Sequence, residues 1–465
     1  MKTLPVFFFF LLILIIACKK DSFITSPDAR VNITVDSLHF DTVFTSTGSV
    51  TQFFKVINEN NQKLKISSVK LMGGPGSSFK INVDGTPGPE VNNLELEAED
   101  SLYVFVSVSI NPNAANLPFI ISDSIEINYN GIKQKVQLEA WGQNAHFFRN
   151  KKITGPETWT NDLPYVILGF LQVDTNAVLT INKGCRIYTH ADAPWLIEGS
   201  FSVNGEKDSI DRVWFRGDRL DEPYRDFPAN WPGLFFRPAS RNNVLNFAII
   251  KNAFQAIAVE EPSVNANPKI ILNECIIDNA YDAGIISLNS SISATNCLVS
   301  NCGKNLLLVQ GGDYQFTHCT IASYSNFYIL HKDPVLLLTN FINVNNVPVT
   351  ANLSATFKNC ILWGENGTVE NEIIVAKAGS TLFTVVFDHD LMKTAPSGAI
   401  VTITTPLLNQ PPLFDSINTS AKFYDFHLNP ASPAINFGMN AGITIDLDGK
   451  SRPVGLPDLG SYEHR

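Results

Sequence analysis

Asn273-Glu274-Cys275-Ile276-Ile277-Asp278-Asn279 decides the fold of this chain, because the same pattern returns at a fixed interval. It recurs as Thr295-Asn296-Cys297-Leu298-Val299-Ser300-Asn301 and again as Thr317-His318-Cys319-Thr320-Ile321, each time 22 residues further on. The register continues to Phe341-Ile342 after another 22 residues and to Cys360-Ile361 after 19 more, and backwards to 246–252. A short β-branched core with asparagine at its corners and a period near 22 predicts a parallel β-helix.

Stacked coils bring equivalent positions together, about 4.8 Å apart. The cysteine position then forms one inward column of mostly small side chains, with members Ala248, Cys275, Cys297, Cys319, Phe341 and Cys360. Four residues later, a column of asparagines is expected at a bend, where this residue tolerates left-handed backbone angles: Asn252, Asn279, Asn301 and Asn345. We therefore expect buried free thiols in the column, and leave open whether Cys185 and Cys302 form disulfides.

The N-terminus has the features of a lipoprotein signal. Lys2 precedes an apolar run from Pro5 to Ala17, and Cys18 follows directly. The run is too short to span a membrane, so the sequence predicts cleavage of signal peptide 1–17, acylation of Cys18 with palmitate among its chains, and a tether over 18–30. We expect membrane anchoring in a cell envelope, as an outer-membrane lipoprotein of a Gram-negative bacterium that faces the surface or the periplasm.

Residues 31–145 read as short strands with alternating apolar residues, as in Phe53-Lys55-Ile57, where the apolar members are expected on one face. Asn130-Gly131 between two alternating runs predicts a type I′ hairpin. The segment is therefore expected to be a β-sandwich. On Asn58-Glu59-Asn60, Asp100-Ser101-Leu102 and Ala140-Trp141-Gly142 it resembles the abnormal-spindle-like (ASH-type) immunoglobulin-like domains of secreted bacterial proteins.

The whole chain is thus expected to be all-β, with the β-helix over 150–440 and a cap segment over 441–465. Asp446-Leu447-Asp448-Gly449 and Asp458-Leu459-Gly460 resemble the closing segment of many secreted β-helix proteins, which implies a cap or anchor element. A net charge of −10 without a basic stripe argues against nucleic acid as a partner.

The repeat resembles right-handed β-helices of the pectate-lyase-like superfamily, which implies polysaccharide lyase or glycoside hydrolase activity as one possibility. Such enzymes need clustered carboxylates. Within the clearest repeats only Asp278 and Asp282 converge across a turn, and a solvated loop is the simpler interpretation. No catalytic constellation is evident, and no zinc spacing or phosphate loop is found.

Two regions contain candidate binding residues. The mixed-charge loop 216–226 and the tryptophan after it offer a sugar-binding wall through Asp218, Arg219, Asp221, Tyr224 and Trp231, with Trp195 as a further aromatic; a structural insertion is the alternative. Asp446 and Asp448 are a weak Ca²⁺ candidate, set against pairing with Lys450 or Arg452. No other cofactor is expected. The predicted function is polysaccharide binding or cell-surface structure, with an enzyme or an adhesin for protein partners as alternatives.

Overall fold

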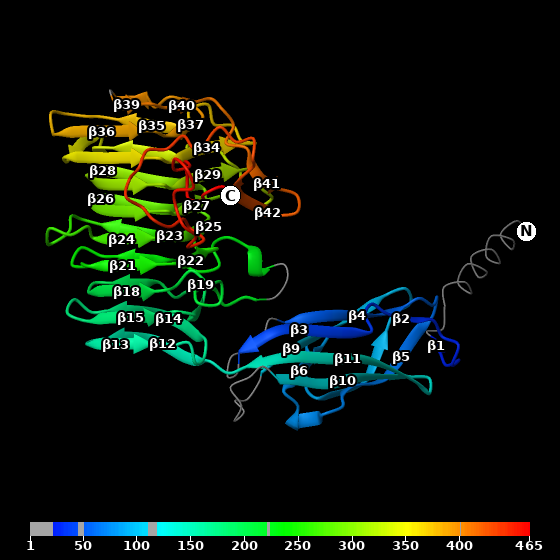
Figure 1. Ribbon diagram of the computed structural model, residues 1–465. Helices are drawn as coiled ribbons and strands as arrows, with labels where there is room; N and C mark the ends of the chain where they lie inside the picture. The colour runs from blue at the N-terminus through cyan, green and yellow to red at the C-terminus, as the bar shows by residue number, and fades with distance from the viewer. Residues whose placement is uncertain (1–21, 45–50, 110–118, 221–223, 400) are drawn as a thin grey trace, which may run out of the picture. The chain divides into compact units, whose positions relative to one another are not determined.

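The computed structural model describes residues 22–44, 51–109, 119–220, 224–399 and 401–465. The chain divides into two compact units, Met1–Asn144 and Ala145–Arg465. Apart from two short 3₁₀ turns, the described residues are strands and loops (Figure 1). The predicted all-β fold is confirmed.

The first unit is a β-sandwich of two sheets. One sheet has the order β1-β5-β10-β11-β3 with β8 beside β5, and the other has the order β2-β4-β9-β6-β7. The elements are β1 (Phe23–Ile24), β2 (Val31–Ile33), β3 (Ser37–Phe44), β4 (Gln52–Asn58), β5 (Lys63–Leu71), the turn η1 (Gly74–Gly76), β6 (Phe79–Val83), β7 (Thr86–Pro87), β8 (Glu90–Leu96), β9 (Ser101–Val108), β10 (Phe119–Tyr129) and β11 (Ile132–Gln143).

Alternation along the strands fills the sandwich core. Asn130 and Gly131 both have positive φ angles and join β10 to β11, which confirms the predicted hairpin. At β4 the predicted inward face is wrong: Phe54 and Val56 are buried, whereas Phe53 is 52% exposed. Lys55 lies two residues after Phe53 and therefore on the same face of the strand. Because the ammonium group of Lys55 stays in water, that face points outward.

The second unit is a parallel β-helix whose coils each have three faces, here called A, B and C (Figure 1). Face A contains β13 (Pro156–Trp159), β15 (Val178–Asn182), β18 (Ser200–Asn204), β21 (Asn243–Asn246), β24 (Ile270–Asn273), β33 (Leu353–Lys358), β36 (Phe383–Asp388) and β39 (Thr402–Thr404). Face B contains β16 (Arg186–Thr189), β19 (Val213–Gly217), β22 (Ala248–Lys251), β25 (Ile276–Asp278), β27 (Leu298–Ser300), β29 (Thr320–Tyr324), β34 (Ile361–Glu365), β37 (Leu391–Met392) and β40 (Leu407–Leu408).

Face C contains β17 (Trp195–Ile197), β20 (Leu234–Phe236), β23 (Gln255–Glu260), β30 (Leu336–Thr339), β35 (Ile373–Ala376) and β38 (Ser397–Gly398). Four longer strands run across two faces: β12 (His146–Ile153), β14 (Tyr165–Val173), β26 (Ala283–Thr295) and β28 (Lys304–Thr317). The coils end at β40, so the predicted β-helix extends too far: the residues after Leu408 form the hairpin of β41 (Phe414–Asn418) and β42 (Phe423–Leu428) and a C-terminal segment.

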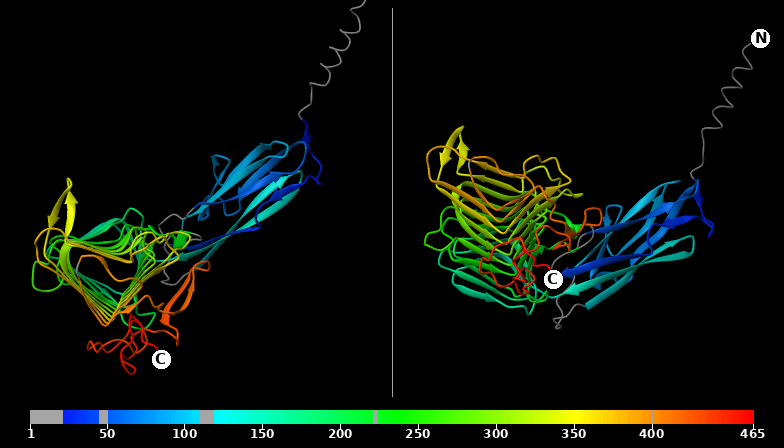
Figure 2. Two further views of the ribbon diagram at one scale, coloured as in Figure 1. Left: turned by 90° about the horizontal axis from the view of Figure 1, so that it is seen from above. Right: turned by 45° about the horizontal axis from the view of Figure 1, so that its top comes forward.

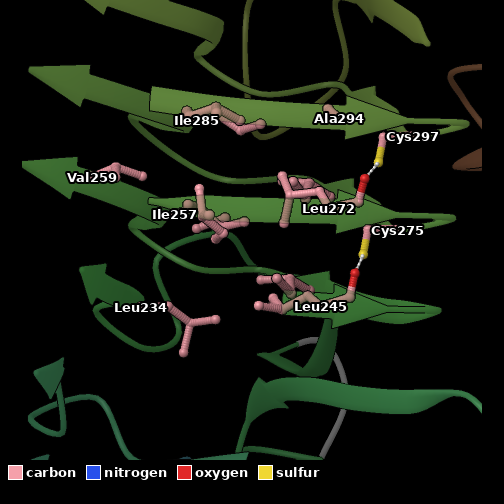
Figure 3. Packing of buried hydrophobic residues seen from close by; sticks show 14 of the residues in the cluster. Leu234, Leu245, Ile257, Val259, Leu272, Cys275, Ile285, Ala294 and Cys297 are labelled. Atoms are coloured by element: carbon pink, nitrogen blue, oxygen red, sulfur yellow. Dashed lines mark hydrogen bonds between the residues drawn. The ribbon is translucent and has the colours of Figure 1, made fainter. Parts of the chain in front are cut away.

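The cysteine column is part of the coil interior. Cys275 donates its thiol hydrogen to the carbonyl of Leu245 on the preceding coil, and Cys297 donates to Leu272 in the same way (Figure 3). Cys319 and Cys360 repeat this contact with Ala294 and Phe316. All six cysteines of the described residues, including Cys185 and Cys302, are buried free thiols. Burial raises the pKa of the thiols of Cys275, Cys297 and Cys319 well above the ordinary value of a cysteine.

Phe341 and Asn345 do not belong to the columns predicted for them. They lie in a hairpin of β31 (Phe341–Val344) and β32 (Val347–Thr350), which leaves the coil between faces C and A (Figure 2). Thr320 on β29 pairs directly with Ile361 on β34, so Cys360 follows Cys319 in the stack. The segment of β31 repeats the local pattern of a coil strand, but its backbone hydrogen bonds go to its own hairpin partner, β32.

Two bends border face B. At the bend between faces A and B, positive φ angles occur at Phe247, Glu274, Asn296, His318 and Asn359. At the bend between faces B and C they occur at Asn252, Asn279 and Asn301, and the Asn279 amide donates to Oδ1 of Asn252 at 2.8 Å. Asparagine suits this backbone region because its short side chain bonds locally.

The C-terminal strap, residues 429–465, lies along the side of the coils, outside their ring (Figure 2, left). The first bend holds it: Asn296 donates to the carbonyl of Ile445, His318 to that of Asp458, and Asn359 to that of Met439. Leu447 and Leu459 of the strap are buried in an apolar cluster with Leu298 and Ile361 of face B. The predicted cap segment therefore covers a lateral face of the solenoid.

Candidate functional site

A groove of about 500 Å³ follows the outer surface of face B. Its floor consists of outward side chains from four stacked strands, β19, β22, β25 and β27. One floor row is apolar, since Trp214, Ile249, Ile276 and Leu298 are aligned coil to coil. The second row lies two residues further along each strand and is polar: Arg216, Lys251, Asp278 and Ser300. The alternation of a strand thus gives the groove an apolar track beside a polar one.

Asp278 is fixed in the polar row by three neighbours. Lys251 Nζ lies 2.9 Å from its Oδ2, and Ser300 donates its hydroxyl to Oδ1 at 2.7 Å. The Asn301 amide donates to the same Oδ1 at 3.4 Å. This half-buried carboxylate is therefore held in one orientation on the groove floor.

The second bend attaches a loop to one border of the groove. Asn252 donates its amide hydrogen to the carbonyl of Arg225, and Asn279 donates to that of Asp226. Both acceptors belong to η2 (Tyr224–Asp226). The asparagine ladder thereby places Asp226 among the residues that line the groove.

The other walls come from distant parts of the chain. The loop after β29 contributes Asn326 and Tyr328, and the β41–β42 hairpin contributes Lys422 and Tyr424. Lys422 donates to the hydroxyl of Tyr328, with its ammonium nitrogen 4.4 Å from the ring centroid. Burial, and then the charge of Asp278, raise the pKa of Tyr424, so its phenol stays protonated.

The charge of the groove differs in sign from that of the chain. Three cations line it, Arg216, Lys251 and Lys422, against two carboxylates, Asp226 and Asp278, so its formal charge is +3 − 2 = +1. The whole chain carries −10. A local excess of positive charge in an acidic protein, beside six aromatic side chains, favours an anionic ligand with apolar ring faces.

The structure places the predicted loop residues beside this groove, where they form structural pairs. Asp218 Oδ2 lies 2.8 Å from His190 Nδ1, and burial raises the pKa of Asp218 against the opposing effect of that histidine. Arg219 lies over the ring of Tyr224 at 3.9 Å. Asp221 lies outside the described residues.

Trp231 is not a sugar-stacking surface, which corrects the prediction. It is 1% exposed and donates from Nε1 to the carbonyl of Lys251, and Trp195 is fully buried. Both indoles belong to the close-packed apolar interior of the coils.

The two residues of the calcium candidate lie in the region of the strap. Asp446 accepts the backbone N–H groups of Lys450 and Glu463. Asp448 accepts from His427 and Lys450, and the hydrogen bond from His427 holds its pKa well below the ordinary value. Within the described ranges, no group of three or more His, Cys, Asp or Glu side chains is arranged to hold a metal ion.

Cys18 and the rest of the predicted signal peptide lie outside the described residues. In the part of the chain that the structure describes, no helix is both long enough and apolar enough to cross a membrane.

Sequence reasoning did not identify Arg216, Lys251 or Lys422. The repeat itself contains a signal for the first two, because the first and third residues after the column position point outward. After Val213 these are Trp214 and Arg216, and after Ala248 they are Ile249 and Lys251. No comparable signal marks Lys422, which lies 171 residues after Lys251 and reaches the groove only through the folded hairpin.

Comparison with known proteins agrees with this architecture. The family described as "Right handed beta helix region" matches residues 169–321, and the second unit is accordingly a right-handed parallel β-helix. A search among curated proteins found no match.

Likenesses to solved structures are short and remote. A family 123 glycoside hydrolase from Clostridium perfringens is 12% identical over 28% of this chain and 30% of its own, with a TM-score of 0.20. The ASH / PapD-like domain of human CEP192 is 14% identical over 27% of this chain and 92% of its own, with a TM-score of 0.18. The Pseudomonas fluorescens alkylpurine DNA glycosylase AlkC is 11% identical over 24% of this chain and 31% of its own, with a TM-score of 0.15. This chain thus spans about a third of the hydrolase and of the glycosylase, and none of these scores carries a functional argument.

Proposed function

We propose that the mature protein is a lipid-anchored envelope protein that binds an anionic polysaccharide in the groove of face B. The observation that supports this most is the combination of Arg216, Lys251 and Lys422 with aromatic walls in one groove. Aromatic faces stack on the C–H faces of sugar rings, and ammonium and guanidinium groups bind carboxylate or sulfate substituents. A groove formed by successive coils also suits an extended polymer.

The remaining parts have supporting roles in this proposal. Acylation of Cys18 would anchor the chain to an outer membrane, and residues 18–30 would serve as a tether. The first unit would act as an ASH-type spacer that keeps the β-helix away from the lipid surface.

Affinity electrophoresis of the unlipidated chain, residues 21–465, tests the binding. Gels containing polygalacturonate, alginate or chondroitin sulfate are compared with gels containing neutral dextran. We expect retardation in the anionic gels alone, reduced about tenfold in affinity for Arg216→Ala combined with Lys422→Ala. Lys152→Ala removes an exposed cation from β12 and is the matched control. Equal retardation of all variants by every polymer would contradict the proposal.

A glycoside hydrolase or polysaccharide lyase is the second candidate, because Asp226 and Asp278 line the same groove. Both enzyme classes require charged groups on either side of the scissile bond. The same incubations are therefore assayed for new reducing or unsaturated ends. New ends that the wild type produces and that Asp278→Asn abolishes would replace the binding function by an enzymatic one. If the protein shows no retention and no cleavage, the result favours an adhesin for protein partners.

A further inference from the structure

The outward face of the sheet β2-β4-β9-β6-β7 has a cluster of three aromatic rings, here called the aromatic platform: the exposed Phe53 and Phe105 and the half-buried Tyr103. Phe53 is 52% exposed and Phe105 is 38% exposed. Phe53 pairs with Phe105 across β4 and β9, and Tyr103 lies two residues before Phe105 on the same face. An antiparallel sheet with one face on the core ordinarily has polar residues on the other, so three neighbouring aromatic rings there require an explanation.

The rings form one continuous surface. Their centroids lie 5.5 Å apart for Phe53 and Tyr103, 6.0 Å for Phe53 and Phe105, and 5.8 Å for Tyr103 and Phe105. The last two rings are inclined by only 12° to each other. The platform therefore presents a strip of aromatic surface in the middle of the sheet.

The surroundings of the platform are cationic and polar. Lys55 Nζ lies 4.6 Å from the centroid of Tyr103. On the other side, Phe105 pairs with Asn82 of β6, and the exposed Lys80 pairs with Ser107. The described strands β4, β6 and β9 contain no aspartate or glutamate at all. Asp84, directly after β6, donates its backbone N–H to the carbonyl of Tyr103, so with Lys55 and Lys80 the formal charge around the platform is +2 − 1 = +1; in a chain of net charge −10 this excess favours a negatively charged ligand.

We propose that the aromatic platform is a second polysaccharide site, which binds anionic sugar chains independently of the groove. The strip of rings stacks on the sugars, Lys55 and Lys80 bind their carboxylate or sulfate groups, and Asn82 and Ser107 bond their hydroxyls.

The test uses the unlipidated chain 21–465, with binding to polygalacturonate, chondroitin sulfate and heparin measured by titration calorimetry. The platform variant is Phe53→Ser with Phe105→Ser. Its matched control is Ile120→Ser with Trp141→Ser, an exposed cross-strand apolar pair on the other sheet of the same unit. Circular dichroism verifies that both double variants fold.

We expect the platform variant to lose about tenfold in affinity for at least one anionic polymer, and the control to stay within twofold. Arg216→Ala with Lys422→Ala serves as the groove variant. If the platform variant loses affinity while the groove variant binds normally, the result supports the platform and contradicts the groove. The two proposals can therefore fail separately. Unchanged affinity of the platform variant for all three polymers overturns this proposal.

Discussion

Replacing Asn359 by alanine is expected to loosen the C-terminal strap. Asn359 is fully buried with a φ of 56°, and its side chain makes three hydrogen bonds. Nδ2 donates to the Met439 carbonyl at 2.7 Å and to Nε2 of His318 at 2.9 Å, and Oδ1 accepts from Met439 N at 2.9 Å. Only the two bonds with Met439 join the coil to the strap, so at about 1 kcal/mol net for each bond strap docking loses about 2 kcal/mol, whereas the bond with His318 lies within the coils.

Hydrogen exchange of the strap amides measures this loss. Gly460 N–H donates to the backbone carbonyl of Asn359, and Met439 N–H donates to its side chain, so both report directly on docking. A loss of about 2 kcal/mol predicts exchange faster by a factor of roughly 30 in the variant. Asn366→Ala is the control, since Asn366 also has a positive φ angle, 58°, but is exposed. Strap amides that exchange within about threefold of the wild-type rate would refute the reasoning.

Three further outcomes follow from buried side chains. Burial, aided by Arg452, lowers the pKa of His318 to about 2. The neutral imidazole therefore contributes its full stability to the fold above the pKa of the unfolded chain, near 6.5, and this contribution is lost as the pH falls. Between pH 7 and pH 5, the free energy of unfolding in urea should fall by about 2 kcal/mol more in the wild type than in His318→Asn, and equal losses would contradict this. In the unlipidated chain 21–465, which lacks Cys18, the six buried thiols should resist alkylation in the native state and take six labels, counted by mass spectrometry, after denaturation; any disulfide would show as missing labels. Trp231→Ala should lower stability by about 3–5 kcal/mol, while Trp231→Phe should leave polysaccharide affinity within about twofold; a large affinity loss in the latter would restore Trp231 as a contact residue.

The stacking of the coils could be predicted from the sequence because it depends on local pattern. The 22-residue repeat of Cys275, Cys297 and Cys319 corresponds to one coil, and the structure aligns Ile276 with Leu298 and Leu298 with Thr320. The same reasoning failed at Phe341, where a hairpin has the local pattern of a coil strand. A pattern of residue types does not show which strand accepts the hydrogen bonds, and that pairing decides membership of the stack.

Less of the candidate site could be predicted, for two physical reasons. The repeat pattern is set by the inward positions, so Arg216 and Lys251, which point outward, can be selected only after the inward column is fixed. The walls come from residues such as Tyr328 and Lys422, which are far apart in sequence and meet through tertiary contacts. Tryptophan in the predicted loop suggested a binding surface, but Trp231 is buried, because burying its large apolar side chain contributes more than exposing it to solvent.

If the groove of face B binds a ligand as proposed, docking of the strap and binding of that ligand should be coupled. The strap follows the first bend, and Tyr462 of the strap lines the groove together with Phe426 of the β41–β42 hairpin. A chain with an undocked strap would lack part of the groove wall, so the apparent dissociation constant equals the intrinsic one divided by the docked fraction. Asn359→Ala should therefore speed exchange of the strap amides by a factor of roughly 30 yet leave affinity almost unchanged while most molecules remain docked. Affinity should fall in proportion only when mild denaturant makes the undocked form the majority. A loss of affinity in Asn359→Ala without faster exchange would show that the two are not linked in this way.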